Sequence, residues 1–446
     1  MAEAALRALS GFGGQRHALA QVVRPQRRAQ LSHLLQGDAA PLLARGFGRA
    51  YGDAAQIDGG HVVDMTRLDR LLDFDAAAGV LVCEAGIRLA EIDRLFLPRG
   101  FCLPVVPGTG WVSIGGAIAA DVHGKNHDRV GSFGDHVQWL DLLTADGNVR
   151  RVDPLATPAL FAATVGGMGL TGIILQAAIR MQAKALPAIA VRERKLTDLD
   201  ALLLALTAQR PNATYSVAWV DALARGKALG RAILETGEPA AAGSALRPAR
   251  QRRLPMTPPG FLPLKLIGKG FNAAWLARLP AAGRDRVIAR ERFFYPLDAV
   301  AGWNRFYGRR GFHQFQCVLP DDRAADGLRR LLELTARSRA GALLAVLKTL
   351  GSPGRGYLSF PMRGHTLALD IPARADAPEL LAALERVTLD CGGRVYLAKD
   401  SALSPEGFAA MYPELERQRK VLAEIDPQGR FQSDLSRRLR LREDAP

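Results

Sequence analysis

Three glycine clusters in the first half of the chain constrain the fold more than any other feature of the sequence. They read RGFGRAYG from Arg45, PGTGWVSIGG from Pro107 and GGMGLTG from Gly166. Glycine has no Cβ, so such turns reach positive φ and bring main-chain N–H groups into contact with an anion. Because Arg45 and Arg49 lie in the first cluster, a phosphate or pyrophosphate is its expected ligand. That cluster alone would fit an ordinary surface turn equally well, so the rest of the sequence must decide.

The segments around these clusters, from about residue 31 to 185, predict short β-strands joined by turns. Apolar residues recur at helical spacing over 88–98, where we predict a helix that ends at Gly100. Two strand patterns around residues 145–148 predict a hairpin. The first part of the chain is therefore expected to contain both helices and strands.

The pattern changes near Pro187, where longer alternating segments begin. Strand patterns with polar residues at every second position cover 312–320, 342–351 and 365–372, and a helix is predicted over 323–337. An antiparallel sheet covered by helices fits this order, so the expected fold class is α+β. The expected organisation is a first domain over 1–186, a second domain over 187–393 and a C-terminal segment over 394–446.

Residues 237–268 interrupt this regularity with a stretch rich in Pro, Gly, Ala and Arg. Its composition predicts a mobile loop. The loop is either a simple insert, or a lid or membrane-facing patch that joins a basic group to an apolar tail. The basic group is Arg250, Arg252 and Arg253, and the apolar tail is Phe261, Leu262, Leu264 and Leu266.

The 446 residues carry a net charge of +15, and the pI is about 10.2. Such a charge favours an anionic partner, which could be nucleic acid, a phosphorylated substrate or an acidic membrane surface. Arginine predominates over lysine, and the sequence contains no recognisable nucleic-acid module or interleaved aromatic–basic stripe. Nucleic acid is therefore not an expected partner.

Four scattered cysteines lack the spacing of a disulfide framework or a metal site, so we expect buried free thiols and no metal. The N-terminus lacks the order of a signal peptide. No apolar run approaches the roughly 18 residues of a membrane span. The protein is expected to be made in the cytoplasm and to be soluble or peripheral to the inner membrane, with the periplasmic face left open.

The glycine clusters belong to longer motifs, which read RGFGRAYGDAAQ, GGAIAADVHGKNHDRVGSFGDH and ATVGGMGLTGIIL. Together they resemble the FAD-binding domain of the vanillyl-alcohol-oxidase-type flavoproteins. The resemblance implies that the first cluster holds the FAD pyrophosphate through main-chain N–H groups, that the second wraps the flavin and that the third supports it. It also implies that residues 1–186 form an FAD-binding domain of two subdomains and that residues 187–393 form a substrate-binding domain. The C-terminal segment over 394–446 would then return to the FAD-binding domain.

The resemblance assigns a set of cofactor contacts, residue by residue. Arg49 stands where many relatives carry a histidine linked to the flavin 8α-methyl group, so FAD is expected to be bound non-covalently. Ala50 replaces the usual serine, with the loss of one hydroxyl contact. The implied cofactor-binding residues are Arg45, Gly46, Phe47, Gly48, Arg49, Ala50, Tyr51, Gly108, Thr109, Ser113, Gly115, Gly116, His123, Gly124, Lys125, Asn126, Ile173 and Tyr396.

Further motifs narrow the resemblance to one branch of the family: HGKNH from His123, YLAKDSAL from Tyr396, and DPQGRFQSDLSRRL near the end. That branch oxidises the 2′-hydroxyl of a polyprenyl-phosphate ribose by hydride transfer to flavin N5, the first half of epimerisation to arabinose for cell-wall arabinan. The implied partners are a lipid-linked phosphopentose, an anionic membrane surface and a separate NAD(P)H-dependent short-chain reductase. The reductase must be separate because this chain shows no clear nicotinamide fingerprint.

Alternation along the predicted strands indicates which residues contact the substrate. Gln314 and Gln316 share one face with Phe312, and amides suit vicinal sugar hydroxyls, although a solvated edge strand would show the same pattern. Lys348 lies at the end of an apolar strand. An ammonium is costly to bury unless it is paired, so we expect Lys348 to bind the substrate phosphate.

The resemblance places Lys399 over the flavin, beside the sugar 2′-hydroxyl. There a lysine stabilises a developing alkoxide or, if its pKa is lowered, acts as a base. The sequence favours the electrostatic role, because it offers no cause for a large fall in pKa. The implied catalytic set is Lys399, His123, Gln316 and Tyr51, and the implied substrate set is Lys125, Tyr295, Gln314, Gln316, Lys348, Ala368 and Lys399.

Ala368 stands where relatives often carry a cysteine. Hydride chemistry needs no thiol, so this difference removes a soft nucleophile without removing the reaction. A sugar-acid or aldonolactone oxidase of the same fold is the alternative enzyme. That branch usually ends in an H-W-x-K segment, whereas the corresponding lysine here lies in YLAKD, so the lipid-linked sugar is the expected substrate.

Overall fold

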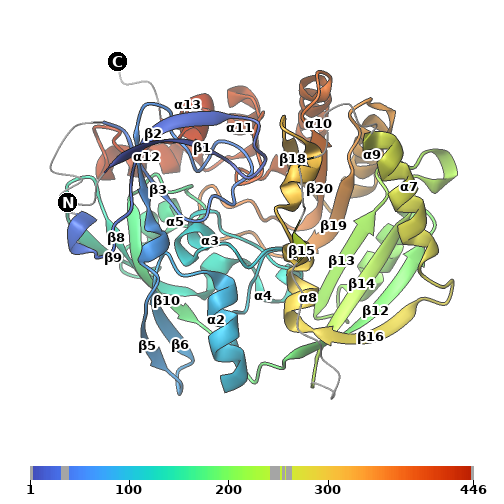
Figure 1. Cartoon of the computed structure of the whole chain (residues 1–446), viewed down its shortest axis with the longest axis horizontal. Coiled ribbons are helices and arrows are strands. Elements are labelled where there is room, and N and C mark those ends of the chain that lie inside the picture. Colours follow the sequence, from blue (N-terminus) through green and yellow to red (C-terminus); the bar gives the residue numbers. More distant parts are fainter. Residues whose placement is uncertain (1–3, 32–39, 242–251, 254–256, 258–263, 443–446) are drawn as a thin grey trace.

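The molecule consists of two halves that lie side by side (Figure 1). One half is built from the N-terminal residues, coloured blue to cyan, and the C-terminal residues, coloured red. The other half is built from the central residues, coloured green to orange. The expected α+β class is confirmed. The computed structural model describes residues 4–31, 40–241, 252–253, 257 and 264–442.

Two sheets form the first half. A four-stranded sheet has the order β1-β2-β4-β3, in which only β1 is antiparallel to its neighbour. A five-stranded antiparallel sheet has the order β5-β6-β10-β8-β9. The strands of these sheets are β1 (Ala5–Ser10), β2 (His17–Val23), β3 (Leu42–Arg45), β4 (His61–Asp64), β5 (Leu71–Asp75), β6 (Val80–Glu84), β8 (Val137–Leu143), β9 (Val149–Val152) and β10 (Ile173–Arg180).

Short helices connect these strands. The helix predicted over 88–98 is confirmed as α2 (Leu89–Phe96), whose apolar stripe packs in the core of this half. Gly100 ends the following turn with a φ of +79°. The other helices of this region are α3 (Ile114–Ala119), α4 (His127–Val130) and α5 (Pro158–Thr164), and the short strands β7 (Phe101–Cys102) and β11 (Gln182–Ala183) pair with each other.

An eight-stranded antiparallel sheet forms the second half, in the order β16-β12-β14-β13-β19-β20-β18-β21. Alternation divides its residues between two faces. In β14, Leu234 packs in the main core, whereas the neighbouring Ile233 packs against α7 (Leu264–Ala277) on the other face. The strands are β12 (Ala188–Leu196), β13 (Tyr215–Val220), β14 (Ala232–Ala240), β16 (Arg284–Ala289), β18 (Phe312–Pro320), β19 (Leu344–Leu350), β20 (Gly364–Pro372) and β21 (Arg394–Val395).

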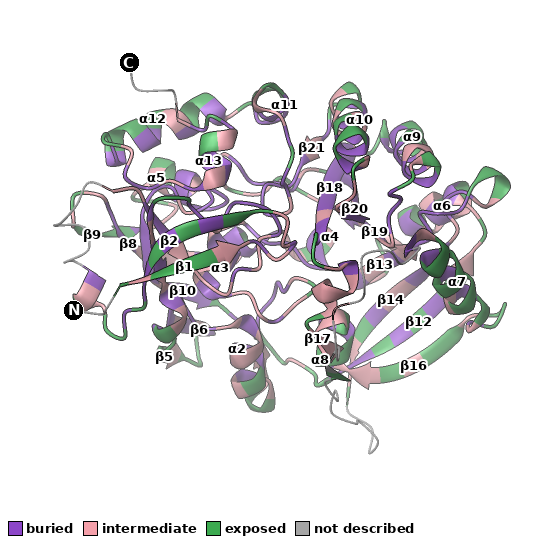
Figure 2. Cartoon of the chain, turned by 45° about the horizontal axis from the view of Figure 1, so that its top comes forward, coloured by how far each residue is buried: buried purple, intermediate pink, exposed green. Residues whose placement is uncertain are grey.

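Three helices cover the main-core face of this sheet: α6 (Leu199–Gln209), α9 (Ala324–Arg337) and α10 (Ala377–Asp390). The Asp198 side chain begins α6 by accepting the Ala201 N–H. Figure 2 shows β18 largely buried beneath these helices. The antiparallel sheet covered by helices is thus confirmed, and its opposite face is left for α7 and for the first half of the molecule.

The C-terminal residues join the two halves. β21 pairs with β18, so this segment begins in the large sheet. It then continues to the first half through α11 (Pro405–Met411), α12 (Leu415–Ile425) and α13 (Asp434–Arg438) (Figure 1). There α12 contacts α5, and Phe431 bridges to Leu42 of β3. Residues from both ends of the sequence therefore lie together.

The loop predicted over 237–268 is regular structure at both of its ends. Strand β14 continues to Ala240 because its last residues still pair with β12, and α7 begins at Leu264, whose side chain is buried. Arg252–Arg253 forms a short strand, β15, that pairs with β17 (Val300–Ala301). The other predicted loop residues, Arg250, Phe261 and Leu262, lie outside the described residues.

Candidate active site

A cavity of about 310 Å³ lies between the two halves. The glycine clusters form one wall, which we call the cofactor wall. Strands β18, β19 and β20 form the facing wall, which we call the substrate wall. The expected site residues that line the cavity are Arg45, Gly46, Phe47, Gly48, Arg49, Ala50, Tyr51, Gly108, Thr109, Ser113, Gly115, Gly116, His123, Gln314, Gln316, Lys348, Ala368, Tyr396 and Lys399.

The first glycine cluster follows β3 in a tight turn. Gly48 has a φ of +62°, and a Cβ at this position would lie 2.2 Å from Arg45 Nη2. Only glycine adopts this conformation without strain. The Arg45 guanidinium donates to the carbonyls of Ser10 and Ala55. Arg45 thereby supports the turn from within.

The end of this cluster lies directly against the YLAKDSAL segment. The Tyr51 N–H donates to the Ala398 carbonyl at 2.9 Å, and a Cβ on Gly52 would lie 1.8 Å from the Asp400 carbonyl oxygen. This close approach brings the side chains of Tyr51 and Lys399 together, so that Lys399 Nζ lies 3.7 Å from the centre of the Tyr51 ring. The face of an aromatic ring attracts an ammonium group.

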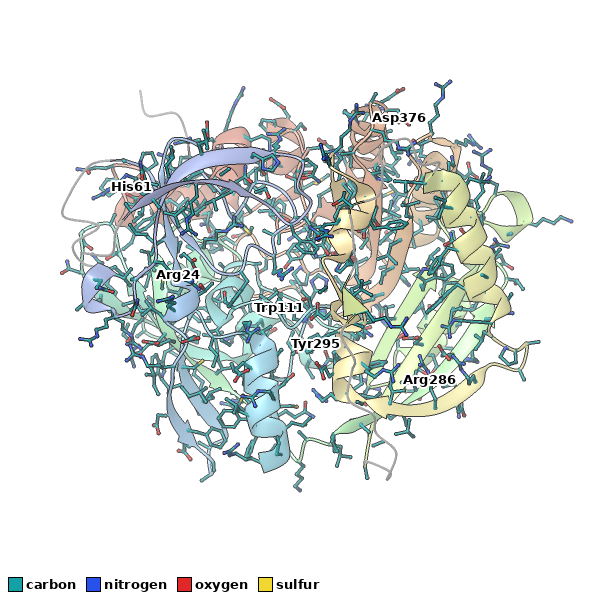
Figure 3. All side chains as sticks on the ribbon, viewed as in Figure 1. Arg24, His61, Trp111, Arg286, Tyr295 and Asp376 are labelled. Carbon is teal, nitrogen blue, oxygen red and sulfur yellow. The ribbon has the colours of Figure 1, made fainter. Side chains whose placement is uncertain are left out.

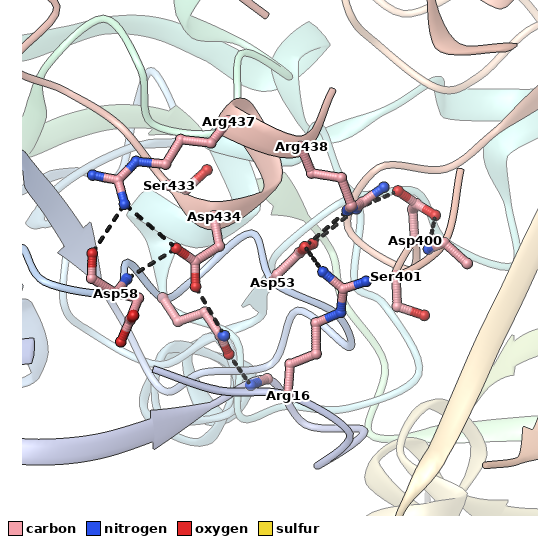
Figure 4. A network of polar contacts seen from close by, with 12 residues as sticks. Arg16, Asp53, Asp58, Asp400, Ser401, Ser433, Asp434, Arg437 and Arg438 are labelled. Carbon is pink, nitrogen blue, oxygen red and sulfur yellow. Dashed lines mark hydrogen bonds and ion pairs between the residues drawn. The ribbon is translucent and has the colours of Figure 1, made fainter. Parts of the chain in front are cut away.

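A buried ion-pair network ties the same two segments together (Figure 4). Arg438, in α13, donates from Nε and Nη2 to Asp53, both at 2.8 Å, and from Nη2 to Asp400 at 2.7 Å. Both carboxylates are buried, and Arg16 lies 3.6 Å from Asp53. Arg438 therefore links the residue two places after Tyr51 to the residue that follows Lys399.

The second glycine cluster is held from both sides. Ser113 begins α3 by accepting the Gly116 N–H at 3.2 Å. Asp298, from the second half of the molecule, accepts the Thr109 hydroxyl at 2.7 Å and the Gly110 N–H at 2.8 Å. Asp298 also lines the cavity, so this carboxylate fixes the glycine loop relative to the substrate wall.

Alternation along three strands gives the substrate wall its side chains. On β18, Gln314 and Gln316 line the cavity, whereas Phe315 and Cys317 pack in the core. The Gln314 amide donates to Asp370, which is buried behind the wall. Strands β19 and β20 add Leu344, Val346, Lys348, Thr366 and Ala368.

His123 connects the two walls. Its Nε2 accepts from Gln316 Nε2 at 3.0 Å, and the same amide nitrogen donates to Thr366 Oγ1 at 3.0 Å. This direction requires a neutral imidazole that carries its proton on Nδ1. Burial, helped by the charge of Lys348, lowers the pKa of His123 well below its usual value. His123 is thus neutral and orients the Gln316 amide.

Two lysines, Lys348 and Lys399, line the cavity without forming an ion pair to any carboxylate among the described residues. Burial lowers the pKa of Lys399 to about 7, against the attraction of Asp370 and with the repulsion of Lys348. Burial and the charge of Lys125 lower the pKa of Lys348 to about 8. The structure thus supplies a cause for a low lysine pKa that the sequence did not offer. Unpaired ammonium groups in a cavity indicate an anionic ligand.

Two expected site residues point away from the cavity. Tyr295 lies at the junction of the halves (Figure 3), but its hydroxyl donates to Asp93 at 3.2 Å. This contact corrects the assignment of Tyr295 to the substrate. Asp298, three residues later in the chain, lines the cavity. Ile173 packs in a separate core cluster, since alternation along β10 brings Ile174 to the cavity.

Gly124, Lys125 and Asn126 also lie behind the cavity wall. Asn126 donates to the Pro104 carbonyl at 2.9 Å. Lys125 donates to the Phe293 carbonyl, and its Nζ lies 3.9 Å from the centre of the Phe293 ring. The expectation of direct ligand contact is therefore corrected to support of the HGKNH segment. Lys125 still acts on the site through its charge, which lowers the pKa of Lys348.

Several lining residues are absent from the expected site set. Thr366 shares the alternating face of Ala368, so the strand pattern already places it on the cavity side. Met168, with a φ of +55°, belongs to the third glycine cluster. Trp303 and Asp298 carried no local signal, because tertiary packing alone brings them to the cavity.

The cofactor wall fits a large anionic nucleotide. A Cβ added to Gly108 or Gly169 would meet nothing within 4 Å, so bare backbone borders the cavity at both positions. The Nε atom of Arg49 is buried and has no hydrogen-bond partner among the described residues. Bare backbone suits a pyrophosphate and a flat ring system, and an unused guanidinium N–H suits an anion.

Comparison with known proteins agrees with this fit. Residues 19–153 match the family described as FAD binding domain. The chain is 38% identical to decaprenylphosphoryl-beta-D-ribose oxidase of Mycolicibacterium smegmatis, over 90% of this chain and 89% of that protein. It is 23% identical to L-gulono-1,4-lactone dehydrogenase of Mycobacterium tuberculosis, over 96% of this chain and 97% of that protein. It is 29% identical to a putative D-arabinono-1,4-lactone oxidase of Neurospora crassa, over 31% of this chain and 24% of that protein.

The fold, the cavity and these matches define an FAD-dependent oxidoreductase that acts on CH–OH groups. Within that class, the chain belongs to the decaprenylphosphoryl-beta-D-ribose oxidase family. None of the helices in the described part of the chain is long and apolar enough to cross a membrane.

Proposed function

We propose that this protein oxidises the 2′-hydroxyl of a polyprenyl-phosphate-linked ribose to the 2′-keto sugar, the first half of an epimerisation to arabinose. Bound FAD supplies the hydride acceptor. The observation that carries the proposal is the set of groups around one cavity, where Lys348 and Lys399 have no carboxylate partner within the described part of the chain and Gln314 and Gln316 present amides. Cations suit a phosphate and a developing alkoxide, and amides suit ribose hydroxyls.

Lys399 is the group that we assign to the hydroxyl proton. With a pKa of about 7, roughly half of the side chains are neutral at neutral pH, so the amine is available as a general base. The ammonium formed by proton transfer faces the Tyr51 ring at 3.7 Å, which favours the charged form. Burial thus shifts our assignment from the electrostatic role to the base.

Lys348 is the group that we assign to the substrate phosphate. Leu344 and Val346 precede it on the same face of β19 and also line the cavity. An apolar strip that ends in a cation suits a lipid chain attached to a phosphate. With a pKa of about 8, Lys348 is mostly charged at neutral pH, and a bound phosphate would raise this pKa further.

A sugar-acid or aldonolactone oxidase of the same fold is the second candidate. The 23% identity to the lactone dehydrogenase over nearly the whole chain favours it. A lactone, however, carries no phosphate to pair with Lys348, and the identity to the ribose oxidase is higher, at 38%. The lipid-linked ribose therefore accounts for more of the site.

The proposed reaction implies two further partners. The keto sugar must be reduced to complete an epimerisation, so we propose a separate NAD(P)H-dependent short-chain reductase. A polyprenyl chain leaves a bilayer only at a cost of about 0.8 kcal/mol per CH₂. We therefore propose that the enzyme works at the anionic surface of the inner membrane.

Anaerobic bleaching of the bound flavin by a panel of prenyl-phosphate riboses and free aldonolactones tests this function. Riboses should bleach the flavin and lactones should not; the reverse result would establish the lactone oxidase. The reduction rate should rise about tenfold between about pH 6 and pH 8, because the neutral amine is the base and its pKa is about 7. A fall over this range would return Lys399 to the electrostatic role, since the ammonium would then be the active form.

A further inference from the structure

Helix α7 presents an exposed face that is almost entirely apolar. Its sequence, LKLIGKGFNAAWLA, contains two lysines and no acidic residue. Leu266, Ile267 and Phe271 are 67%, 39% and 54% exposed, and Figure 2 shows much of the helix in the colour of exposed residues. A surface helix normally presents polar residues to water. Clustered exposed apolar side chains indicate an interaction surface.

The opposite face of α7 is firmly docked. Its buried residues repeat every four positions, as Leu264, Gly268, Asn272 and Leu276. The Asn272 amide donates to Asp221 at 2.6 Å, and Leu276 packs with Ile233 of the large sheet. These contacts fix which face of the helix packs on the sheet. The apolar residues on the outer face therefore have no role in this packing and need another explanation.

The docked face adjoins the active-site cavity. A Cβ on Gly268 would lie 2.8 Å from Leu343 Cδ2, and the next residue, Leu344, lines the cavity. Leu343 also packs against the aromatic cluster that contains Tyr51 and Phe312. The docked face of α7 therefore packs against the residue that directly precedes the apolar strip of the substrate wall.

Charge distinguishes between the possible partners. Lys265 and Lys269 are the charged residues of α7, and Lys269 is exposed beside the apolar side chains. The whole chain carries a net charge of +15, so a second copy would bring like charge to this face. Exposed apolar side chains with lysines and without acids suit shallow insertion into an anionic lipid surface.

We propose that α7 is the surface through which this protein docks on an anionic bilayer, with Leu266, Ile267 and Phe271 among the headgroups and Lys269 beside them. The inference rests on the proposed lipid-linked substrate, because only such a substrate requires its enzyme to work at a bilayer. Docking next to the substrate wall lets the lipid chain pass between bilayer and cavity with little exposure to water.

The test measures binding to vesicles and oxidation of sugar separately. Holoenzyme carrying Leu266→Glu and Phe271→Glu is compared with a matched variant carrying Leu155→Glu and Leu204→Glu, at leucines that are 91% and 73% exposed outside α7. Co-sedimentation uses phosphatidylcholine vesicles with roughly one-third phosphatidylglycerol. We expect the α7 variant to bind at least about tenfold more weakly, and the matched variant to change by less than about twofold.

Both variants should keep FAD and should be bleached by a short, water-soluble prenyl-phosphate ribose as the unchanged enzyme is. Equal binding by all three proteins, or equal loss in both variants, would overturn the assignment of α7. If the α7 variant lost self-association in light scattering but kept its vesicle binding, α7 would be a contact between copies of the chain. That result would also overturn the assignment of α7 to the bilayer. Normal vesicle binding without bleaching by any ribose would refute the proposed function and leave α7 docking in place.

Discussion

The two walls of the cavity recognise their ligands by different means. The cofactor wall is largely backbone, with glycines at Gly46, Gly48, Gly108, Gly115, Gly116, Gly169 and Gly172. The substrate wall presents side chains from alternate positions of β18, β19 and β20. Backbone donors suit a cofactor that is always the same, whereas side chains can be exchanged as the substrate changes. Cofactor binding and turnover should therefore be separable by mutation.

A covalent bond between the protein and FAD would contradict the proposed difference between the two walls. If the cofactor wall holds FAD without a covalent bond, all of the flavin should be released by acid precipitation without proteolysis. The resemblance places Arg49 where a linking histidine would stand, and the one histidine that lines the described cavity, His123, bonds to Gln316. Flavin absorbance should appear in the supernatant. Flavin that remained in the precipitated protein would contradict the prediction.

The Lys399→Ala variant tests most directly whether turnover can be lost while cofactor binding is kept. The variant should keep FAD, because the segment of Lys399 contacts the first glycine cluster through the backbone of Ala398 and Asp400, which the substitution leaves in place. Turnover should fall by a factor on the order of 10² or more, the scale of losing one preorganised catalytic group. Stopped-flow flavin reduction measures the effect, with the exposed Lys420→Ala as the control. Near-normal reduction would remove Lys399 from the mechanism.

Lys348→Met should act on substrate binding more than on chemistry. Methionine keeps a similar length but removes the charge that we assign to the phosphate. KM for a prenyl-phosphate ribose should rise at least about tenfold while kcat changes by less than about threefold, because binding is lost equally in the ground and transition states. A ribose analogue without the phosphate serves as the control and should react equally with both enzymes. An unchanged KM would show that the phosphate lies elsewhere.

Arg438→Met should have a smaller effect on the reaction, because this residue supports the segments of Lys399 and Tyr51 and does not itself line the described cavity. Removing the guanidinium that pairs with both buried carboxylates, Asp53 and Asp400, should lower the melting temperature. We also expect the rate of flavin reduction per bound FAD to fall about fivefold, with KM nearly unchanged, because the base is displaced from its position. Arg438→Lys should restore part of the rate.

Arg437→Met provides the matched control for this variant, since Arg437 lies in the same helix and its guanidinium donates to Gln432 and to the Asp58 carbonyl. It should react at the normal rate. A normal rate per bound FAD in Arg438→Met, together with a lower melting temperature, would reduce Arg438 to a purely structural residue.

The same contrast explains what the sequence could predict. Glycine clusters are local signals, and three of them in order within longer motifs indicate the cofactor wall; Gly48 and Gly108 lie on the cavity as expected. Strand alternation is also local, and it placed Gln314, Gln316 and Lys348 on one wall. These features depend on neighbours only a few residues away.

Features that depend on distant contacts were not predictable. Tyr295 and Asp298 lie three residues apart, yet only tertiary packing decides that Asp298 reaches the cavity while Tyr295 turns to Asp93. The low pKa of Lys399 arises from burial, which a single segment cannot reveal. The first turn of α7 falls in the loop predicted over 237–268, because the Pro, Gly, Ala and Arg content of that stretch conceals where the helix begins.

The link between Arg438 and Asp53 spans 385 positions of the sequence, and this separation has a consequence for how the enzyme is made. The ribosome completes the first glycine cluster long before it reaches α13, so the early segment waits without its buried ion pairs and without the Ala398 backbone contact. Contacts between such distant residues form late and slowly. Stable loading of FAD is therefore expected to follow translation of α13, and a nascent chain stalled before Arg438 should not retain flavin.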